Sequence, residues 1–299
     1  MGVSDHQPLT IGIIGAGEMG AAVGQRLREG GARAITTLRG RSPASVERVR
    51  RAGLETVEDD SNFVLESDLI LSIVPPGQAV AVAERYHQAL KGTGGKAIFA
   101  DCNAVSPATI RQIAELLAGD CRFIDAGIIG GPPPPGRLDR GPRFYASGAD
   151  AVSLTGLRQH GLDIAVIDGP IGAASALKLS YAGLTKGLIA LAAAMIGGAT
   201  RAGLADALGA ELARSQPALL SMIGTRMPAM FPKADRWVAE MEEIAAFLGD
   251  SENGATIYEG MARLYERVAA DWEKGGGGGR LIRDLESFAA AVIPASASA

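Results

Sequence analysis

Short apolar runs alternate with amphipathic stretches through the first half of the chain. Each run has four to six residues and is rich in Ile, Val, Leu or Phe, which is typical of buried strands. The predicted strands are Leu9–Ile14, Ala34–Leu38, Leu69–Val74, Ala97–Ala100, Arg122–Ala126 and Asp163–Ile167. Because strands alternate with helical segments, the pattern predicts a mostly parallel sheet that helices cover on both faces.

Two of the helices have clear starting signals. Ser42-Pro43 and Ser106-Pro107 each offer an N-cap serine followed by proline at the first helical position. The strand pattern ends at Asp168, and Ala- and Leu-rich helical segments replace it beyond that point. The sequence therefore predicts a doubly wound α/β Rossmann domain over residues 1–168 and an all-α domain over residues 169–299.

The first helix of the predicted C-terminal domain is long, from Gly172 to about Ala202. Its small apolar residues, such as Ala192–Ala194 and Gly197-Gly198, would allow a second helix to approach closely. This favours a homodimer formed through the C-terminal helical domain. The alternative is a helix buried in the core of its own domain.

Composition excludes several classes of protein. The 299 residues are 47% hydrophobic and 21% charged, and the net charge of −4 leaves no basic excess for binding nucleic acid. The two cysteines, Cys102 and Cys121, give neither a disulfide framework nor zinc-ligand spacing. The longest apolar run, Gly187–Ala199, is shorter than the roughly 18–20 residues of a membrane span. We expect a cytoplasmic protein with a small-molecule substrate and with neither nucleic acid nor membrane as a partner.

Two further features carry no predicted chemistry. The histidines His6, His87 and His160 are scattered, and none lies in a metal-ligand motif. Lys274 and the glycine run Gly275–Gly279 are interpreted as a loop, because a phosphate loop would need a strand before it.

A glycine-rich turn follows the first predicted strand and opens a helix over Glu18–Glu29. Within Gly15-Ala16-Gly17-Glu18-Met19-Gly20 the three glycines have G-x-G-x-x-G spacing. The first glycine permits the tight turn, the second lets a pyrophosphate approach the backbone, and the third allows close packing of helix and strand. The free N–H groups at the start of the helix suit the anion. The pattern predicts a dinucleotide site, and the alternative is a glycine turn without a ligand.

The residues after the second predicted strand indicate which dinucleotide binds. A site for NAD usually has Asp or Glu at this place to bind the ribose hydroxyls. This chain has Arg39, Gly40, Arg41 and Ser42 instead. Two guanidinium groups and a hydroxyl suit a 2′-phosphate, so we predict NADP rather than NAD. The alternative is a pair of solvated loop arginines.

Lys178 lies inside the long apolar helix and is the candidate chemical group. Such a lysine either extends to solvent or lies in a polar cleft between the domains, where partial desolvation would make it a usable proton donor and acceptor. Lys186, close to the same helix face, is a second candidate. Tyr181 is three residues after Lys178 and can be its neighbour.

Four segments resemble, in order, motifs of the β-hydroxyacid dehydrogenase superfamily. This superfamily includes the 3-hydroxyisobutyrate dehydrogenases and the N-terminal part of 6-phosphogluconate dehydrogenase. The segments are the glycine turn Gly15–Gly20, Asp101–Pro107, Asp125–Gly131 and Gly169–Lys178. The resemblance spans nearly the whole chain and indicates a branch of the superfamily with an atypical C-terminal domain.

The resemblance implies an NAD(P)-dependent dehydrogenase or reductase acting on a β-hydroxy acid or related alcohol. Lys178 would be the general acid/base. Gly130 and Gly131 would donate backbone N–H groups to a substrate carboxylate. The residues implied at the nicotinamide end are Val74, Pro75, Pro76 and Asn103.

The chain departs from the family at Gly127, Ile129 and Ala182, where the family has Pro, Ser and Asn. Two polar substrate contacts are therefore absent. We expect a bulkier or less polar substrate that lies against Ile129, with Tyr181 or Lys186 supplying replacement contacts.

Two later segments leave alternatives open. Arg236 and Trp237 either border the active site or belong to an amphipathic helix whose acidic face includes Glu240–Glu243. Pro132–Pro135 and Arg137 are interpreted as a stiff surface connection, with Arg137 reaching an anionic substrate as the alternative.

Two other functions remain open. One is an imine reductase, although such relatives commonly lack a lysine at the position of Lys178. The other is a non-catalytic NADP(H)-binding protein, which Ile129 and Ala182 favour.

Overall fold

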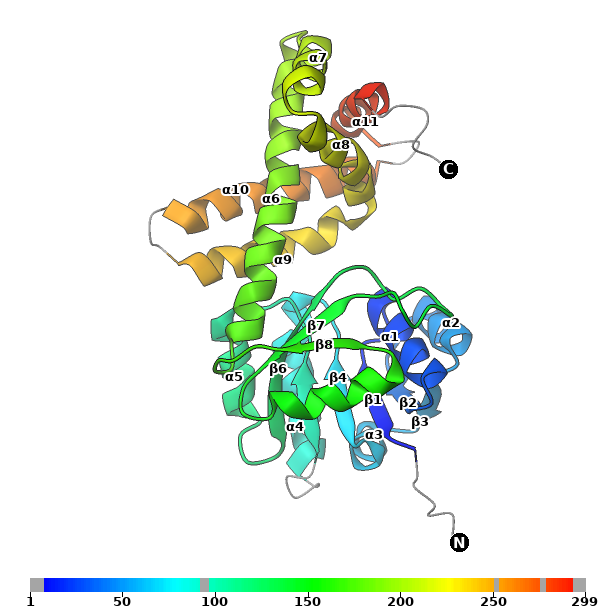
Figure 1. The fold of residues 1–299 in the computed structure, drawn as a ribbon. Coiled ribbons are helices and arrows are strands. Elements are labelled where there is room, and N and C mark those ends of the chain that lie inside the picture. Colours follow the sequence, from blue (N-terminus) through cyan, green and yellow to red (C-terminus); the bar gives the residue numbers. More distant parts are fainter. Residues whose placement is uncertain (1–7, 92–96, 250–252, 275–277, 293–299) are drawn as a thin grey trace, which may run out of the picture. The chain divides into compact units, whose positions relative to one another are not determined.

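The structure is a computed structural model that describes residues 8–91, 97–249, 253–274 and 278–292. The chain divides into two compact units, Met1–Leu179 and Ser180–Ala299. The division falls inside the long helix α6 (Ala173–Arg201) (Figure 1). The domain boundary after Asp168 stays a prediction.

One sheet organises the described part of the first unit. Its strand order is β3-β2-β1-β4-β5-β6-β7-β8, and all neighbours are parallel except β6 and β7. The strands are β1 (Thr10–Ile14), β2 (Arg33–Thr37), β3 (Glu55–Val57), β4 (Leu69–Ser72), β5 (Ile98–Asp101), β6 (Arg122–Ile129), β7 (Arg143–Ser147) and β8 (Asp163–Val166). The strand order reverses between β1 and β4, where open α/β sheets bind ligands beyond the strand ends. The doubly wound Rossmann fold predicted from the sequence is confirmed.

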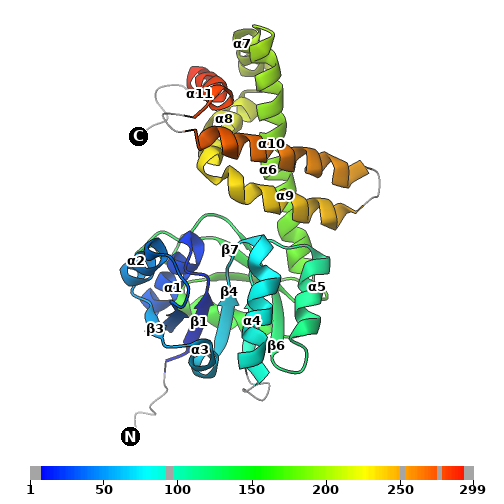
Figure 2. The same ribbon diagram turned by 180° about the vertical axis from the view of Figure 1, so that it is seen from behind.

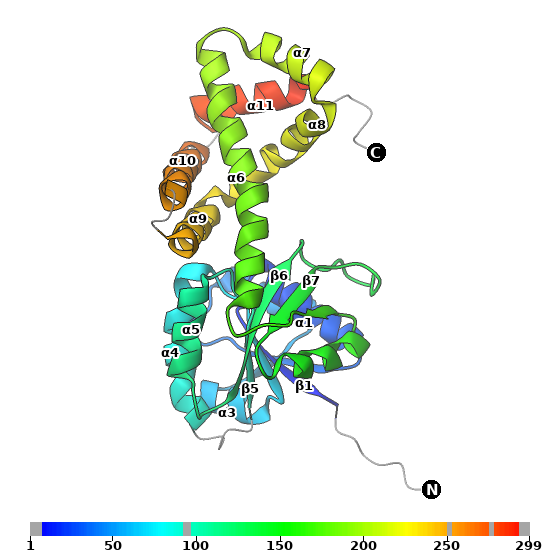
Figure 3. The ribbon, with the colours of Figure 1, turned by 60° about the vertical axis from the view of Figure 1, so that its left-hand side comes forward.

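Helices cover both faces of this sheet, as Figure 3 shows. On one face lie α1 (Glu18–Glu29), α2 (Pro43–Ala52) and the 3-10 helix η2 (Ala151–His160). On the other lie α3 (Asp60–Glu66), α4 (Ala79–Lys91) and α5 (Pro107–Leu116). The predicted caps are confirmed, since Ser42 Oγ accepts a hydrogen bond from Ser45 N and Ser106 Oγ accepts one from Thr109 N.

Two strands were not predicted, β3 and β7. β3 has only three residues, none of them buried, and lies at the sheet edge, so its sequence shows no apolar run. β7 begins with an exposed Arg143 and pairs antiparallel with β6 across a long Gly- and Pro-rich connection. β6 is also longer than predicted and reaches Ile129, so Gly127 and Ile129 lie in a strand and not in a loop.

The described part of the second unit is helical, as predicted. After α6 come α7 (Ala205–Ser215), α8 (Pro217–Arg226), the 3-10 helix η3 (Pro228–Lys233), α9 (Ala234–Leu248), α10 (Gly254–Trp272) and α11 (Arg280–Val292). Helices α9 and α10 lie side by side (Figure 2). Gly183 of α6 brings the helix backbone close to α10, because a Cβ there would lie 2.9 Å from Tyr258 Oη. The interpreted loop at Gly275–Gly279 lies mostly outside the described residues.

The apolar stretch of helix α6 is longer than the uncharged run Gly187–Ala199. Among the described residues it is the one helix long and apolar enough to cross a membrane by length and composition, with a mean hydropathy of 1.5. Half of that stretch is buried inside the protein, as it is in core helices of globular folds. Length and composition therefore do not by themselves assign α6 to a membrane.

Candidate functional site

The glycine turn between β1 and α1 has the tight geometry that the sequence predicts. Gly15 has a φ of +100°, and a Cβ there would overlap the carbonyl oxygen of Ile73. A Cβ on Gly20 would overlap the carbonyl oxygen of Gly15. Packing within the chain therefore explains why positions 15 and 20 are occupied by glycine.

Gly17 differs from the other two glycines because packing does not explain it. It is exposed at the N-cap of α1, has an ordinary φ of −70°, and no atom lies within 4 Å of a Cβ built there. The open space lies directly before the free N–H groups of the helix start. This is the place at which a pyrophosphate would approach the backbone, so the turn fits a dinucleotide. Of the other predicted turn residues, Ala16 is buried, Met19 is half-buried and Glu18 is exposed.

The residues after β2 lie at the carboxyl edge of the sheet. Arg39 is exposed and Arg41 half-buried, and neither forms an ion pair with another described residue. Ser42 Oγ is occupied by the cap of α2 and by Ser45 Oγ at 3.2 Å. The two arginines therefore keep their charges available for an anionic ligand.

Sequence reasoning missed Arg48 on α2. Its Nη1 donates a hydrogen bond to the carbonyl oxygen of Ala16 at 2.9 Å and to Ser45 Oγ at 3.3 Å. A third guanidinium group thus lies beside the glycine turn. The signal available in the sequence was a cation on the helix that follows the arginine-rich segment.

Asn103 ties together the ends of β4 and β5. Its Oδ1 accepts a hydrogen bond from the backbone N–H of Val74 at 2.7 Å, and its Nδ2 donates to Ser72 Oγ at 3.2 Å and Asp101 Oδ2 at 2.9 Å. Asn103 is 2% exposed. Its side chain therefore orients the segment that begins at Val74 and continues into the short 3-10 helix η1 (Pro76–Gln78). Of the two predicted prolines, Pro75 is exposed and Pro76 is half-buried.

A row of aligned residues crosses the sheet just below its carboxyl edge. Ile14 pairs with Ser72, Ser72 with Asp101, and Asp101 with Asp125. Ser72, Asp101 and Asp125 are all buried. Burial raises the pKa of Asp101 to about 7, against hydrogen bonds from Asn103 that lower it.

The start of α6 lies against β6 at the same edge. A Cβ on Gly127 would lie 2.9 Å from Lys178 Cβ and 3.0 Å from the carbonyl oxygen of Ala174. The absence of a side chain at Gly127 therefore lets α6 approach the strand closely. Lys178 is half-buried there. The strand that carries Gly127 is separated from the glycine turn of β1 only by β4 and β5.

The predicted substrate glycines follow the end of β6. Gly130 has a φ of +130°, and a Cβ there would lie 2.9 Å from Pro142 Cα, whereas no atom lies within 4 Å of a Cβ on Gly131. Both glycines are exposed, and Ile129 before them is half-buried. The backbone of these two glycines is therefore exposed to solvent.

The connection from β6 to β7 is held by α1. Arg26 is 2% exposed, and its Nη2 donates hydrogen bonds to the carbonyl oxygens of Pro134, Arg137 and Arg140. The exposed Arg137 side chain pairs with Asp139 at 3.0 Å. This geometry favours the interpretation of the segment as a structural connection.

Tyr181 and Lys186 belong to the second unit. Tyr181 is 44% exposed. Lys186 forms an ion pair with Glu240 of α9, and its Nζ lies 4.9 Å from the centre of the Trp237 ring. Tyr265 of α10 packs edge-on against Trp237 and donates a hydrogen bond to the carbonyl oxygen of Lys186 at 2.6 Å. The charge of Lys186 is therefore matched inside its own unit.

Other candidate groups have simple surroundings. Arg236 is exposed. His87 contacts Asp120 at 2.9 Å, and His160 contacts the carbonyl oxygen of Gly30 at 2.8 Å, while His6 lies outside the described residues. In the part of the chain that the structure describes, no three His, Cys, Asp or Glu side chains are grouped to hold a metal ion.

The fold and the glycine turn define a Rossmann protein with a dinucleotide site. Two family models match the chain. The NAD binding domain of 6-phosphogluconate dehydrogenase covers residues 10–152, and a domain of unknown function (DUF1932) covers residues 199–268. A curated relative, an uncharacterised 28.5 kDa protein from Methanothermus fervidus, is 30% identical over 241 residues, which are 80% of this chain and 91% of that protein.

Solved structures of similar fold include a conserved protein of unknown function described as similar to 3-hydroxyacid dehydrogenases. It is 29% identical, has a TM-score of 0.65, and the match covers 88% of this chain and 97% of that one. The 3-hydroxyisobutyrate dehydrogenase of Mycobacterium tuberculosis with L-serine has a TM-score of 0.67 at 17% identity, covering 94% and 99% of the two chains. A reductive aminase from Aspergillus terreus, solved with NADPH4, cyclohexanone and allyl amine, has a TM-score of 0.53 at 18% identity over 94% and 99%.

The chain therefore belongs to the 6-phosphogluconate dehydrogenase-like family, as the sequence motifs indicated. Within it, the chain lies in the branch whose C-terminal region carries the domain of unknown function, next to relatives of 3-hydroxyisobutyrate dehydrogenase-like fold. The identities of 17% and 18% show a shared fold and nothing about the substrate.

Proposed function

We propose that the protein is an NADP-dependent oxidoreductase that transfers a hydride between the nicotinamide and a β-hydroxy acid or related alcohol. One observation carries this proposal. The stem of Lys178 lies against Gly127 on β6, at the sheet edge where the dinucleotide turn opens from β1. An amine and a dinucleotide site on one edge of one unit are the two parts that acid/base-assisted hydride transfer needs.

We propose the following roles in binding for residues of the first unit. The backbone of Gly15–Gly20 would hold the pyrophosphate, and Arg39 and Arg41 would hold a 2′-phosphate. The backbone that Asn103 orients would line the nicotinamide end. When bound there, the cofactor would supply the hydride chemistry, as the acceptor NADP+ in oxidation and the donor NADPH in reduction. Gly130 and Gly131 would bind a substrate carboxylate.

Lys178 would move the proton that accompanies the hydride. In the oxidation direction its neutral amine would take the proton of the substrate hydroxyl, while the hydride would pass to the nicotinamide from the carbon that bears this hydroxyl. In the reduction direction the ammonium group returns that proton to the carbonyl oxygen. The positive charge also stabilises the alkoxide character that develops on this oxygen.

The substrate is proposed to be bulkier or less polar than a short hydroxy acid. Ile129 stands where the family has a serine, and Ala182, 2% exposed, cannot supply an amide. Burying an apolar side chain of the substrate against Ile129 would favour binding by about 25 cal/mol per Å².

The test is turnover with NADPH and a panel of oxo acids, hydroxy acids and cyclic imines, followed by absorbance. Lys178→Ala should lower kcat by about 10²- to 10⁴-fold, the usual contribution of a general acid/base. Lys233→Ala, at an exposed position of the second unit, is the matched control and should retain turnover. A loss of less than about tenfold in Lys178→Ala would remove Lys178 from the mechanism. Turnover of imines alone would favour imine reduction, and cofactor binding without turnover of any class would favour a binding protein.

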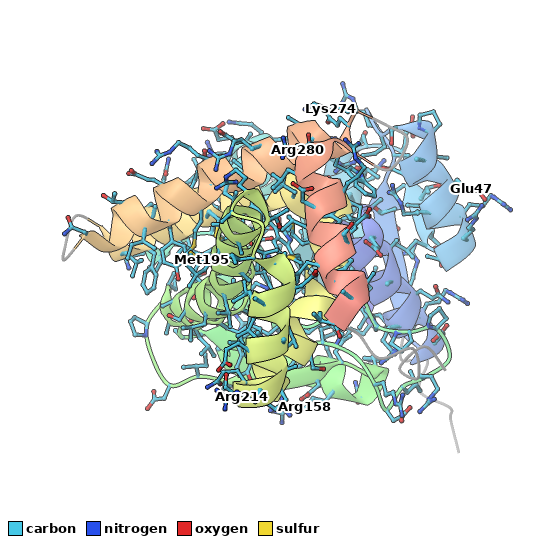
Figure 4. The ribbon with its side chains drawn as sticks, turned by 90° about the horizontal axis from the view of Figure 1, so that it is seen from above. Glu47, Arg158, Met195, Arg214, Lys274 and Arg280 are labelled. Carbon is cyan, nitrogen blue, oxygen red and sulfur yellow. The ribbon has the colours of Figure 1, made fainter. Side chains whose placement is uncertain are left out.

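We also propose a homodimer in the cytoplasm that forms through α6. Exposed apolar residues recur at spacings of three and four along α6 in the second unit: Tyr181, Leu184, Leu191 and Met195, between 44% and 74% exposed. Leu188, half-buried, completes the series. Alternate spacings of four and three form a continuous apolar stripe, which two copies of one helix can bury against each other. Figure 4 shows Met195 among the labelled side chains.

A further inference from the structure

A buried carboxylate from the sheet caps the first turn of α6. Asp125 of β6 has no exposed surface. Its Oδ2 accepts hydrogen bonds from the backbone N–H groups of Gly172, Ala174 and Ser175 at 2.8, 3.1 and 3.2 Å. Its Oδ1 accepts one from Ser175 Oγ at 2.6 Å. One side chain thus satisfies most of the N–H groups that a helix start leaves without partners.

The neighbouring strand reinforces this cap. Ser147 of β7 pairs with Asp125 in the sheet register. Its Oγ donates a hydrogen bond to Asp125 Oδ2 at 2.8 Å and accepts one from the backbone N–H of Ala174 at 3.0 Å. Buried side chains of two neighbouring strands are therefore hydrogen-bonded to the start of α6.

The cap must come from elsewhere because the residue before α6 cannot provide it. Gly172 has no side chain and adopts a φ of +106°. A helix that caps itself gains stability, but that cap does not connect the helix to a neighbouring element. A cap from a strand instead fixes both the axial position and the rotation of the helix on the sheet.

We propose that Asp125 is a positioning residue that sets the place of the Lys178 amine. The argument is geometric, since Lys178 follows Ser175 by three residues and its Cβ lies against Gly127, two residues after Asp125 on the same strand. Strand and helix are therefore joined at the turn before Lys178 and at the lysine stem itself. Asp125 acts through α6 and does not touch the substrate. The consequence for turnover rests on the proposed role of Lys178, but the positioning itself does not.

The test compares Asp125→Asn with the wild-type protein in two measurements. Acetic anhydride labelling followed by peptide mass spectrometry reports the reactivity of the Lys178 amine, with the exposed Lys233 as internal reference. We expect the labelling rate of Lys178 to change by at least about threefold while that of Lys233 stays the same. We expect kcat to fall by at least about tenfold, because a shift of about 1 Å at a reacting group can cost that much or more, with the Kd for NADPH within about twofold of the wild-type value.

Asp271→Asn is the matched control. Asp271 is 6% exposed and binds the start of α11, accepting hydrogen bonds from Ile282 N at 3.0 Å and Lys274 Nζ at 2.8 Å. Its loss should lower Tm without changing the labelling of Lys178 or kcat. If Asp125→Asn behaves in the same way, Asp125 only stabilises the fold and the proposal is overturned.

Smaller changes keep the test informative if Asp125→Asn does not fold. Ser147→Ala removes one hydroxyl of the cap and should shift the labelling rate of Lys178 in the same direction as Asp125→Asn. Ser147→Thr keeps the hydroxyl, so Lys178 should be labelled at the wild-type rate. Unchanged labelling in a folded Ser147→Ala also overturns the proposal. If labelling shifts in Asp125→Asn but Lys178→Ala retains turnover, the positioning is supported and the proposed function fails.

Discussion

The side chain of Asn103 accepts a hydrogen bond from the backbone N–H of Val74 and donates one to Asp101. These two bonds connect the ends of β4 and β5. All the polar atoms of this amide face partners in a buried setting. The backbone proposed to line the nicotinamide end thus depends on a side chain from the next strand.

Asn103→Ala is expected to lower stability and weaken cofactor binding together. Removing the amide takes this partner from the buried Ser72 Oγ and Asp101 Oδ2 and from the half-buried N–H of Val74. An unsatisfied buried group costs about 1–3 kcal/mol before relaxation. Urea unfolding and a fluorescence titration with NADPH measure the two effects. Asn62→Ala, at an exposed position of α3, should change neither. If Asn103→Ala is destabilised but binds NADPH with wild-type affinity, Asn103 does not contribute to cofactor binding.

Asp101 is expected to make stability fall as the pH rises. Its folded pKa of about 7 lies above the ordinary value of 3.8 for an aspartate, so the folded state binds more protons than the unfolded state between these values. The free energy of unfolding should therefore decrease as pH rises from about 4 to about 7, and the contribution should level off above that. Urea titrations at several pH values should show a smaller decrease for Asp101→Asn. Equal slopes in both proteins would rule out a raised pKa for Asp101.

Gly127→Ala is expected to displace α6 from β6. The added methyl group would lie 2.9 Å from Lys178 Cβ and 3.0 Å from a backbone oxygen, closer than such atoms pack. We expect kcat to fall by about tenfold to a hundredfold with NADPH affinity retained. Gly156→Ala, where no atom lies within 4 Å, is the control. Full activity in Gly127→Ala would show that the fit of α6 on β6 does not govern turnover.

Arg41→Ala is expected to reduce the preference for NADPH over NADH. A lost charge-assisted hydrogen bond to a phosphate costs about 1.5–3 kcal/mol, or about tenfold to a hundredfold in kcat/KM for NADPH, and leaves NADH unaffected. The control is Arg51→Ala on α2, whose arginine pairs with Glu47 (labelled in Figure 4). An unchanged preference would assign the discrimination to Arg39 or Arg48.

The α6 stripe is expected to hold two copies together. Leu184→Glu with Leu191→Glu places two charges on this stripe and should shift the protein from dimer to monomer in analytical ultracentrifugation. Val152→Glu, at a 68% exposed position of η2, should leave the dimer intact. A wild-type protein that is monomeric at micromolar concentration would contradict the proposal.

The sequence by itself determined the features that depend on neighbours along the chain. The glycine turn, the serine caps of α2 and α5 and the apolar strands are local, because each rests on backbone geometry or side-chain period within a few residues. The order of the four family motifs placed Lys178 at a candidate site.

Only the tertiary structure decided which distant residues meet. β3 lacks an apolar run, and β7 has only the short run Phe144–Ala146 between two polar residues. Both strands pair with strands whose identity the local pattern does not reveal. Asp125 contacts the start of α6 from 47 to 50 residues away, and Lys186 meets Glu240 from 54 residues away. Such contacts are chosen by the packing of whole elements, since a side chain's partner depends on which surfaces the fold brings together.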